Sequence, residues 1–243
     1  SRESIVIRMS FLFLQYVLTL TLLIVAVYFN RHLQFLQNTP TGFRSEGILY
    51  AQLVNRNQLE YGSAGRQNYE QIWKKQISYI EKWTPNRSES ILYNTSSQYT
   101  IINDKDESQK LLVRFVGKNY FDIHDLKFTD GSMPELKRDA SNHKVVLNKA
   151  AMKAFGYQKA SEAFVRSEEP LWFSFNTVTN EYIKGGIELM PVEAVVTDYY
   201  AGHVSEGIKP MMFLLSDEDM DGHVAINVQK GKEKEVIDYL GNM

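Results

Sequence analysis

The sequence contains no cysteine among its 243 residues, so disulfide bridges, zinc–thiolate sites and thiol nucleophiles are excluded. It also has no excess of charge of one sign, because 27 Lys and Arg residues face 29 Asp and Glu residues, for a formal net charge of −2. Nucleic-acid binding usually requires a basic face, so this balance argues against a nucleic-acid partner. Without disulfides, the folded part must be stabilised by its own hydrophobic core, which this length permits.

The common motifs of catalysis are also lacking. The zinc-protease pattern H-E-x-x-H, the phosphate-binding pattern G-x-x-x-x-G-K-[ST] and the nucleophile elbow G-x-S-x-G do not occur. No two histidines are four residues apart, and we interpret all five as scattered structural or surface residues: His32, His124, His143, His203 and His223. The sequence therefore predicts no catalytic, cofactor-binding or metal-binding residues, and it names no substrate-binding residue. A membrane-tethered hydrolase is therefore a weaker hypothesis than a function without catalysis.

One acidic stretch resembles half of a calcium loop. Residues 217–222 read DEDMDG, which fits the start of an EF-hand. The loop needs a bidentate Glu at its twelfth position, and that position is Val228. The flanking segments have the pattern of strands rather than helices, so we interpret this stretch as an acidic turn.

The most informative feature present is a long uncharged run. Residues 9–30 contain no charged side chain, and a helix of that length covers roughly 33 Å, about the thickness of a bilayer's hydrocarbon core. A signal peptide would have a shorter apolar core and a small-residue cleavage site, and a buried core helix would be shorter and amphipathic. We therefore predict a membrane span. Arg2 and Arg8 favour a cytoplasmic N-terminus, whereas Arg31 weakens that bias.

The rest of the chain mixes strand and helix patterns without a strict alternation, which predicts an α+β fold. The membrane helix is expected to continue through residues 33–37 until Thr39 and Pro40 interrupt it. Apolar spacing predicts helices at 69–83, 119–126, 148–155 (with Gly156 as C-cap) and 232–240. Alternating or β-rich runs predict strands at 47–54, 90–93, 110–116, 144–147, 170–175, 187–197, 210–215 and 223–229.

Four stretches in order carry a family resemblance: YFNRHLQFLQNTPTGFRSEGILYAQL (28–53), NYFDIHDLKFTDGSMPE (119–135), KVVLNKAAMKAFGY (144–157) and VEAVVTDYYAGHVSEGIKPMMFLL (192–215). Together they resemble the extracytoplasmic domain of MacB/FtsX-type ABC transporter permeases, particularly the compact versions of Bacteroides-like bacteria. Departures from that pattern are Ala194 in place of a usual Gly, Ser132 in place of a frequent Arg, and Ala163-Phe164 in place of a P-[IL]-G turn.

The resemblance implies a particular organisation. Residues 1–38 would form the transmembrane helix and its extension. Residues 39–95 and 222–243 would form a porter-like lobe, and residues 96–221 an inserted β-rich lobe. A permease of this kind continues through further membrane helices, so we expect this sequence to be a piece of a longer protein.

The resemblance also implies a function. The domain would couple ATP-driven motion of a partner ABC ATPase to export or release of a substrate on the outer side of the membrane, without being an enzyme itself. Its partners would be that ATPase, the remaining helices of the permease, a second permease copy or homologue, and the lipid bilayer. The location would be the bacterial inner membrane with a periplasmic domain, and no cofactor is expected. The alternative is the extracytoplasmic ligand-sensing domain of a membrane signal receptor.

Overall fold

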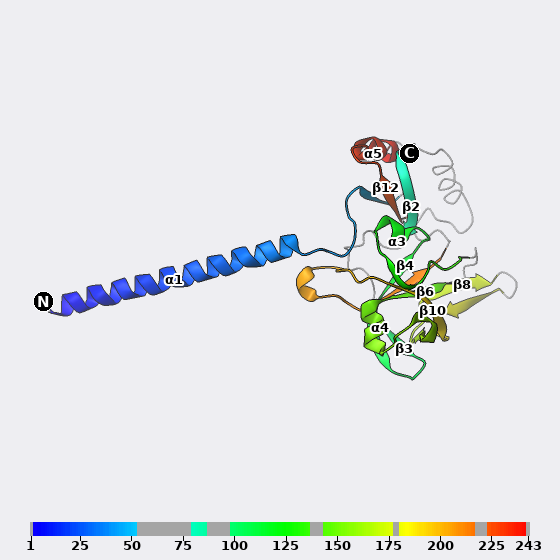
Figure 1. Cartoon of the computed structure of the whole chain (residues 1–243), viewed down its shortest axis with the longest axis horizontal. Coiled ribbons are helices and arrows are strands. Elements are labelled where there is room, and N and C mark those ends of the chain that lie inside the picture. Colours follow the sequence, from blue (N-terminus) through cyan, green and yellow to red (C-terminus); the bar gives the residue numbers. More distant parts are fainter. Residues whose placement is uncertain are drawn as a thin grey trace. The chain divides into compact units, whose positions relative to one another are not determined.

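The fold is taken from a computed structural model, which describes residues 2–52, 79–86, 98–136, 143–176, 180–216 and 223–241 (Figure 1). The chain divides into two compact units, Ser1–Pro40 and Thr41–Met243. Each unit is considered separately below.

The first unit is one helix, α1 (Arg2–Asn38), of 37 residues. Its segment Ile5–Leu36 has a mean hydropathy of 2.2, and none of that window is buried within the protein, so the helix is long and apolar enough to cross a membrane. The hydroxyls of Thr19 and Thr21 donate to the carbonyls of Gln15 and Val17, each at 2.8 Å, which satisfies both groups within the helix. The predicted extension beyond residue 30 is confirmed, and the helix ends just before Pro40.

The second unit is a mixed α/β domain, as the sequence predicts. Its strands are β1 (Ile48–Gln52), β2 (Ile80–Asn86), β3 (Gln98–Asn103), β4 (Ser108–Val116), β5 (Phe128–Gly131), β6 (Lys144–Asn148), β7 (Phe164–Ser167), β8 (Trp172–Asn176), β9 (Glu181–Gly185), β10 (Met190–Val196), β11 (Met211–Leu215) and β12 (His223–Val228). Its α-helices are α3 (Tyr120–Ile123), α4 (Lys149–Phe155) and α5 (Glu233–Gly241), and single 3₁₀ turns lie at Ala160–Glu162 and Val204–Glu206.

Six strands of the sheet form a closed ring in which each strand pairs with two neighbours. The order β4-β11-β6-β10-β7-β3 is completed by pairing of β3 with β4, and we call these six strands the ring. Most neighbours in the ring are antiparallel, but β11 runs parallel to β4, and β10 runs parallel to β6. Closing a sheet removes the unpaired edges that would otherwise invite aggregation. Strand β5 is added outside the ring along β10, and β8 and β9 form a separate hairpin.

Several ring strands are buried on both faces. Along β11, Met212 and Leu214 belong to one core cluster, whereas Phe213 belongs to another. Strand β6 alternates in the same way, because Val145 and Leu147 lie in the first cluster and Val146 in the second. This explains why these strands read as continuous apolar runs rather than as an alternation of apolar and polar residues.

Helix α4 is held at both ends by local chemistry. The Asn148 side chain accepts a hydrogen bond from the Ala151 amide at 2.9 Å, which caps the first turn. The same side chain donates to the Lys209 carbonyl and accepts from the Met211 amide, each at 2.9 Å, so it also fixes the start of β11. At the other end Gly156 adopts φ = 72°, a left-handed conformation that favours glycine. The predicted helix and its C-cap are confirmed.

Strands β1, β12 and β2 form an antiparallel sheet, and β12 lies in the centre. We call these strands together with α5 the three-stranded layer. It has its own core cluster, formed by Val224, Ile226, Val228 and Val236. In the described part of the chain, one residue pair, Asn86 with Val116, joins β2 to β4 of the ring. Figure 1 shows β2, β12 and α5 together on one side of the domain. The two-lobe division at residues 95 and 222 stays a prediction.

One sequence prediction is wrong. The expected helix at 69–83 does not extend to residue 83, because Ile80–Asn86 is strand β2 and pairs with β12. Pairing with β12 outweighs the helical spacing of the apolar residues here, as tertiary context often does. Pro85, expected to end a helix, lies inside this strand. The remainder of that predicted helix and the predicted strand 90–93 lie outside the described residues.

Candidate functional site: the joining segment and helix α3

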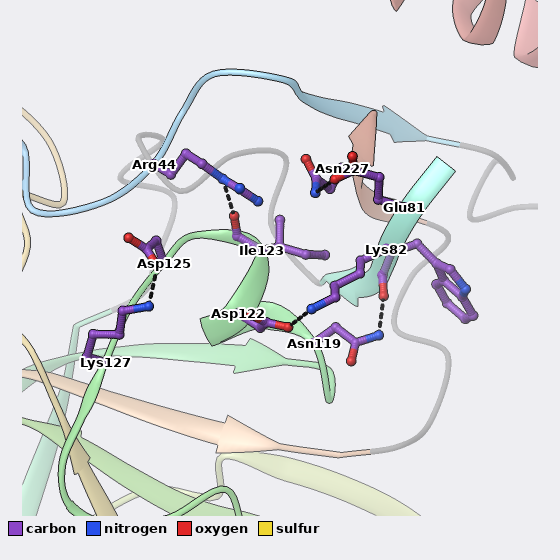
Figure 2. Close-up of polar contacts among 10 residues, drawn as sticks. Arg44, Glu81, Lys82, Asn119, Asp122, Ile123, Asp125, Lys127 and Asn227 are labelled. Atoms are coloured by element: carbon purple, nitrogen blue, oxygen red, sulfur yellow. Dashed lines mark hydrogen bonds and ion pairs between the residues drawn. The ribbon is translucent and has the colours of Figure 1, made fainter. Parts of the chain in front are cut away.

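The globular unit begins with residues 41–44, which we call the joining segment because they follow α1 directly in the chain. The Tyr200 amide donates to the Thr41 carbonyl at 2.9 Å, and the Arg44 amide donates to the His124 carbonyl at 2.8 Å. The Arg44 side chain adds a bond from its Nε to the Ile123 carbonyl at 3.1 Å, which Figure 2 shows. The joining segment is therefore fixed at both ends, on the loop after β10 and on the end of α3.

Gly42 allows the backbone of the joining segment to approach the backbone of Asp198 and Tyr199 closely. It has φ = +84°, and a Cβ added there would lie 2.7 Å from the Asp198 carbonyl oxygen and 3.0 Å from the Tyr199 Cα. Only glycine fits a backbone approach of this kind without displacing the neighbouring chain. Next to it, the Phe43 ring meets the Tyr199 ring edge to face, with centroids 5.7 Å apart. The joining segment thus packs against a buried aromatic residue of the domain core.

His124 follows α3 and is completely buried. Its Nδ1 lies 2.8 Å from the Tyr120 carbonyl oxygen, and its Nε2 lies 2.7 Å from the Tyr50 hydroxyl. A carbonyl can only accept, so Nδ1 carries the proton and Nε2 accepts from Tyr50. Burial lowers the pKa of His124 from its usual 6.5 to about 4, although the hydrogen bond to Tyr120 raises it. A neutral histidine therefore joins β1 of the three-stranded layer to α3.

Beside His124 lies a buried cluster of one arginine and two tyrosines. Arg114 is 2% exposed, and the Tyr120 and Tyr199 hydroxyls lie 3.5 Å apart. Burial raises the pKa of both tyrosines, while the Arg114 charge opposes that shift. Burial disfavours the Arg114 charge, but the surrounding tyrosine oxygens favour it, and its pKa lies above the usual value. The Arg114 guanidinium therefore stays positively charged beside Tyr120 of α3.

Helix α3 also contacts β2. The Asn119 side chain donates to the Trp83 carbonyl at 2.8 Å, and Lys82 forms an ion pair with Asp122 (Figure 2). Within the three-stranded layer, the Asn227 amide donates to the Glu81 carboxylate at 2.6 Å. The short segment around α3 therefore touches β1, β2 and the joining segment, and its own Tyr120 and Phe121 are buried in the ring's second core cluster.

Sequence reasoning located α3 but missed the importance of one residue in this site. The spacing of the five histidines does not distinguish His124 from the others, yet His124 links β1, α3 and the joining segment. The signal that could have identified it is its place in the apolar pattern of 119–126, where a buried polar residue requires partners. His143 lies against Trp172, with ring centroids 4.3 Å apart, and the His203 ring is within 2.6 Å of the Ser205 hydroxyl.

No group of three His, Asp or Glu residues arranged to hold a metal ion occurs in the described part of the chain. The acidic turn at 217–222 lies outside the described residues. The arrangement around α3 consists of backbone hydrogen bonds, aromatic packing and a buried neutral histidine.

The domain has the fold of MacB-like periplasmic domains. The solved periplasmic region of MacB from Actinobacillus actinomycetemcomitans matches with a TM-score of 0.51 and 17% identity, over 83% of this chain and 83% of that chain. The extracellular domain of YknZ, a noncanonical ABC-type transporter from Gram-positive bacteria, matches with a TM-score of 0.45 and 13% identity, over 80% of this chain and 87% of that one. No family model and no curated protein matches the sequence.

Proposed function

We propose that this chain is the extracytoplasmic part of an ABC transporter permease, in which α1 spans the bacterial inner membrane. The fold shared with the periplasmic region of MacB supports this class of function, as does the apolar helix that precedes the domain. A partner ABC ATPase would supply the energy, and the domain would use it to export or release a substrate outside the membrane. The permease would work as a pair of like or homologous chains, each with further membrane helices.

The observation that carries the coupling role is the fixed joining segment. A tether that merely anchored a domain would need only a flexible linker, such as a Gly/Ser-rich stretch. Here the chain passes from the last residue of α1, Asn38, to the hydrogen-bonded Thr41 within three positions. Movement of the helix would therefore act on α3 and on the loop after β10 instead of being absorbed by slack. In this proposal the division into a porter-like lobe and an inserted lobe supplies the parts that move.

The test is a distance measurement on the full chain assembled with its ATPase and reconstituted in a bilayer. Because the sequence has no cysteine, Gln34→Cys and Glu188→Cys would carry two spin labels at defined exposed positions. We expect ATP to shift the distance distribution between them. We also expect Gly42→Ala to blunt that shift, since its Cβ would strain the backbone by about 1–2 kcal/mol and push against Asp198.

A control at a second glycine separates coupling from general strain. Gly207 also has positive φ, but nothing lies within 4 Å of a Cβ added there. Gly207→Ala should therefore leave the ATP-dependent shift intact. A distance distribution that ATP does not change in the unmodified assembly would overturn the coupling role and favour the sensing alternative.

The membrane assignment of α1 is tested separately. Leu22→Lys places a charge near the middle of the apolar segment, at a cost on the order of 2.5–3.5 kcal/mol on insertion scales. We expect the variant to lose insertion and transport, whereas Leu22→Ala retains both. Normal insertion together with normal ATP-driven transport in Leu22→Lys would refute the span.

A further inference from the structure

A cavity of about 470 Å³ is formed where α4 and the residues after it face β5 and β10. Its volume is within the range of small-molecule sites. Asp130 of β5 pairs directly with Val195 of β10, so the strand side of the cavity is a continuous piece of sheet.

The charge of this cavity is unbalanced. Lys149 and Lys153 both line it, and they are one helical turn apart on the same face of α4. In the part of the chain that the structure describes, neither ammonium group takes part in an ion pair. Asp130 is the one acidic residue in the lining, and its Oδ2 accepts a hydrogen bond from the Ala160 amide at 2.6 Å. Two cationic groups therefore face a single carboxylate that already has a partner.

Part of the cavity lining is apolar. Met152 and Val195 contribute to the lining and are 5% and 4% exposed, since both belong to the domain core. The Tyr157 hydroxyl is engaged by Asp104 and by the Phe164 carbonyl, so this residue presents its ring rather than its hydroxyl to a ligand. The rim near Gly156 is open, because no atom lies within 4 Å of where its Cβ would be.

We propose that this cavity binds a small amphipathic anion, whose carboxylate or phosphate lies between Lys149 and Lys153 and whose hydrocarbon part packs on Met152 and Val195. Lysine ammonium groups attract either anion as point charges. The apolar part of the lining favours an organic anion over an inorganic one, which cannot gain from covering it. This site is independent of the proposed coupling role, because it shares no residue with the joining segment or α3.

The test uses the full chain in nanodiscs of zwitterionic lipid, with ¹⁹F NMR of 6,6,6-trifluorohexanoate as the carboxylate probe. Empty nanodiscs correct for partition into lipid. Unlabelled hexyl phosphate and inorganic phosphate serve as competitors, and trifluorohexanamide serves as the neutral analogue. We expect saturable binding of the carboxylate, displacement by hexyl phosphate at lower concentration than by inorganic phosphate, and at least tenfold weaker binding of the amide.

Matched variants locate the site. Lys149→Gln with Lys153→Gln should weaken binding of the carboxylate at least tenfold. Lys110→Gln with Lys184→Gln removes the same charge from exposed positions elsewhere and should have no effect. Equal binding of the amide and the carboxylate by the unmodified chain, absence of saturable binding, or an equal loss in both double variants would each overturn the proposal. Because no ATPase or transport is involved, such a result would leave the coupling role standing, and a failure of coupling would leave this site standing.

Discussion

The ring and the three-stranded layer differ in how their strands are paired and how far they are buried. The ring closes through the β3–β4 pairing, and its strands β6 and β11 have core on both faces. The three-stranded layer has a small core of its own. Among the described residues it meets the ring through one residue pair of β2 and β4, through Tyr50 of β1, which packs against the ring's second core cluster, and through the contacts of α3. The ring therefore has the larger and more continuous core of the two regions, and the joining segment packs against that core through Phe43.

The largest effect is expected from Phe213→Ala in the ring. Phe213 is completely buried and packs against Phe121 and Tyr199, with ring centroids 5.2 and 6.4 Å away. Removing a buried aromatic ring costs about 3–5 kcal/mol of unfolding free energy. Amide hydrogen exchange should show faster opening in both the ring and the three-stranded layer. Preserved protection of β12 in this variant would contradict the view that the layer depends on the ring.

The converse change is Ile226→Ala in the three-stranded layer. Ile226 is completely buried between Leu49 of β1 and Trp83 of β2, and its truncation should cost about 2–4 kcal/mol. We expect hydrogen exchange to accelerate in β1, β2, β12 and α5, while β6 and β11 keep their protection. Equal acceleration in β11 would show that the two regions unfold as one unit.

Acid should weaken the boundary between the regions through His124. Its folded pKa of about 4 lies below the unfolded value of 6.5, so the unfolded chain binds a proton that the folded chain does not. The stability contribution of this group is therefore fully present above pH 6.5, falls as the pH drops towards 4, and declines no further below that. The loss amounts to about 3 kcal/mol over this range.

The measurement is denaturant unfolding of the chain and of His124→Gln at several pH values. The variant should show a flatter profile between pH 6.5 and 4. His203→Gln is the control, because His203 is exposed. If the profile of His124→Gln follows that of the unmodified chain, His124 is not the group that titrates.

The smallest effect is expected from the ion pair across the boundary. Lys82 and Asp122 are both well exposed, at 47% and 62% of the side chain, and solvent screens such pairs strongly. Lys82→Met should change the unfolding free energy by less than about 1 kcal/mol, and added salt should narrow the difference further.

Replacing Asn119 by Ala removes a backbone-directed bond at the same boundary and should cost more, about 1 kcal/mol. A reversed order would mean that charge, not the α3 backbone contact, holds β2.

The sequence predicted much of this architecture where local rules decide the structure. The pattern KVVLNKAAMKAFG gave both β6 and α4, because Asn148 and Gly156 are caps with strong positional preferences. The prediction of a helix is wrong at residues 80–83. There Ile80 and Trp83 fit a helix as well as a strand, and only pairing with β12 decides between the two. The candidate site was not predictable as a site, because Arg44, Tyr50 and His124 meet only after distant segments have folded together.

Pairing between the first and last strands of the domain has a consequence for biosynthesis. Ile48 of β1 lies opposite Asn227 of β12, so β1 has no described strand partner until nearly the whole domain has been synthesised. The ring can assemble earlier, because its strands all lie between residues 98 and 215. During synthesis β1 would therefore remain an unpaired strand next to a completed ring, exposed to chaperones or to mispairing. The last step of folding would be the one that attaches β12 and completes the layer that α3 contacts.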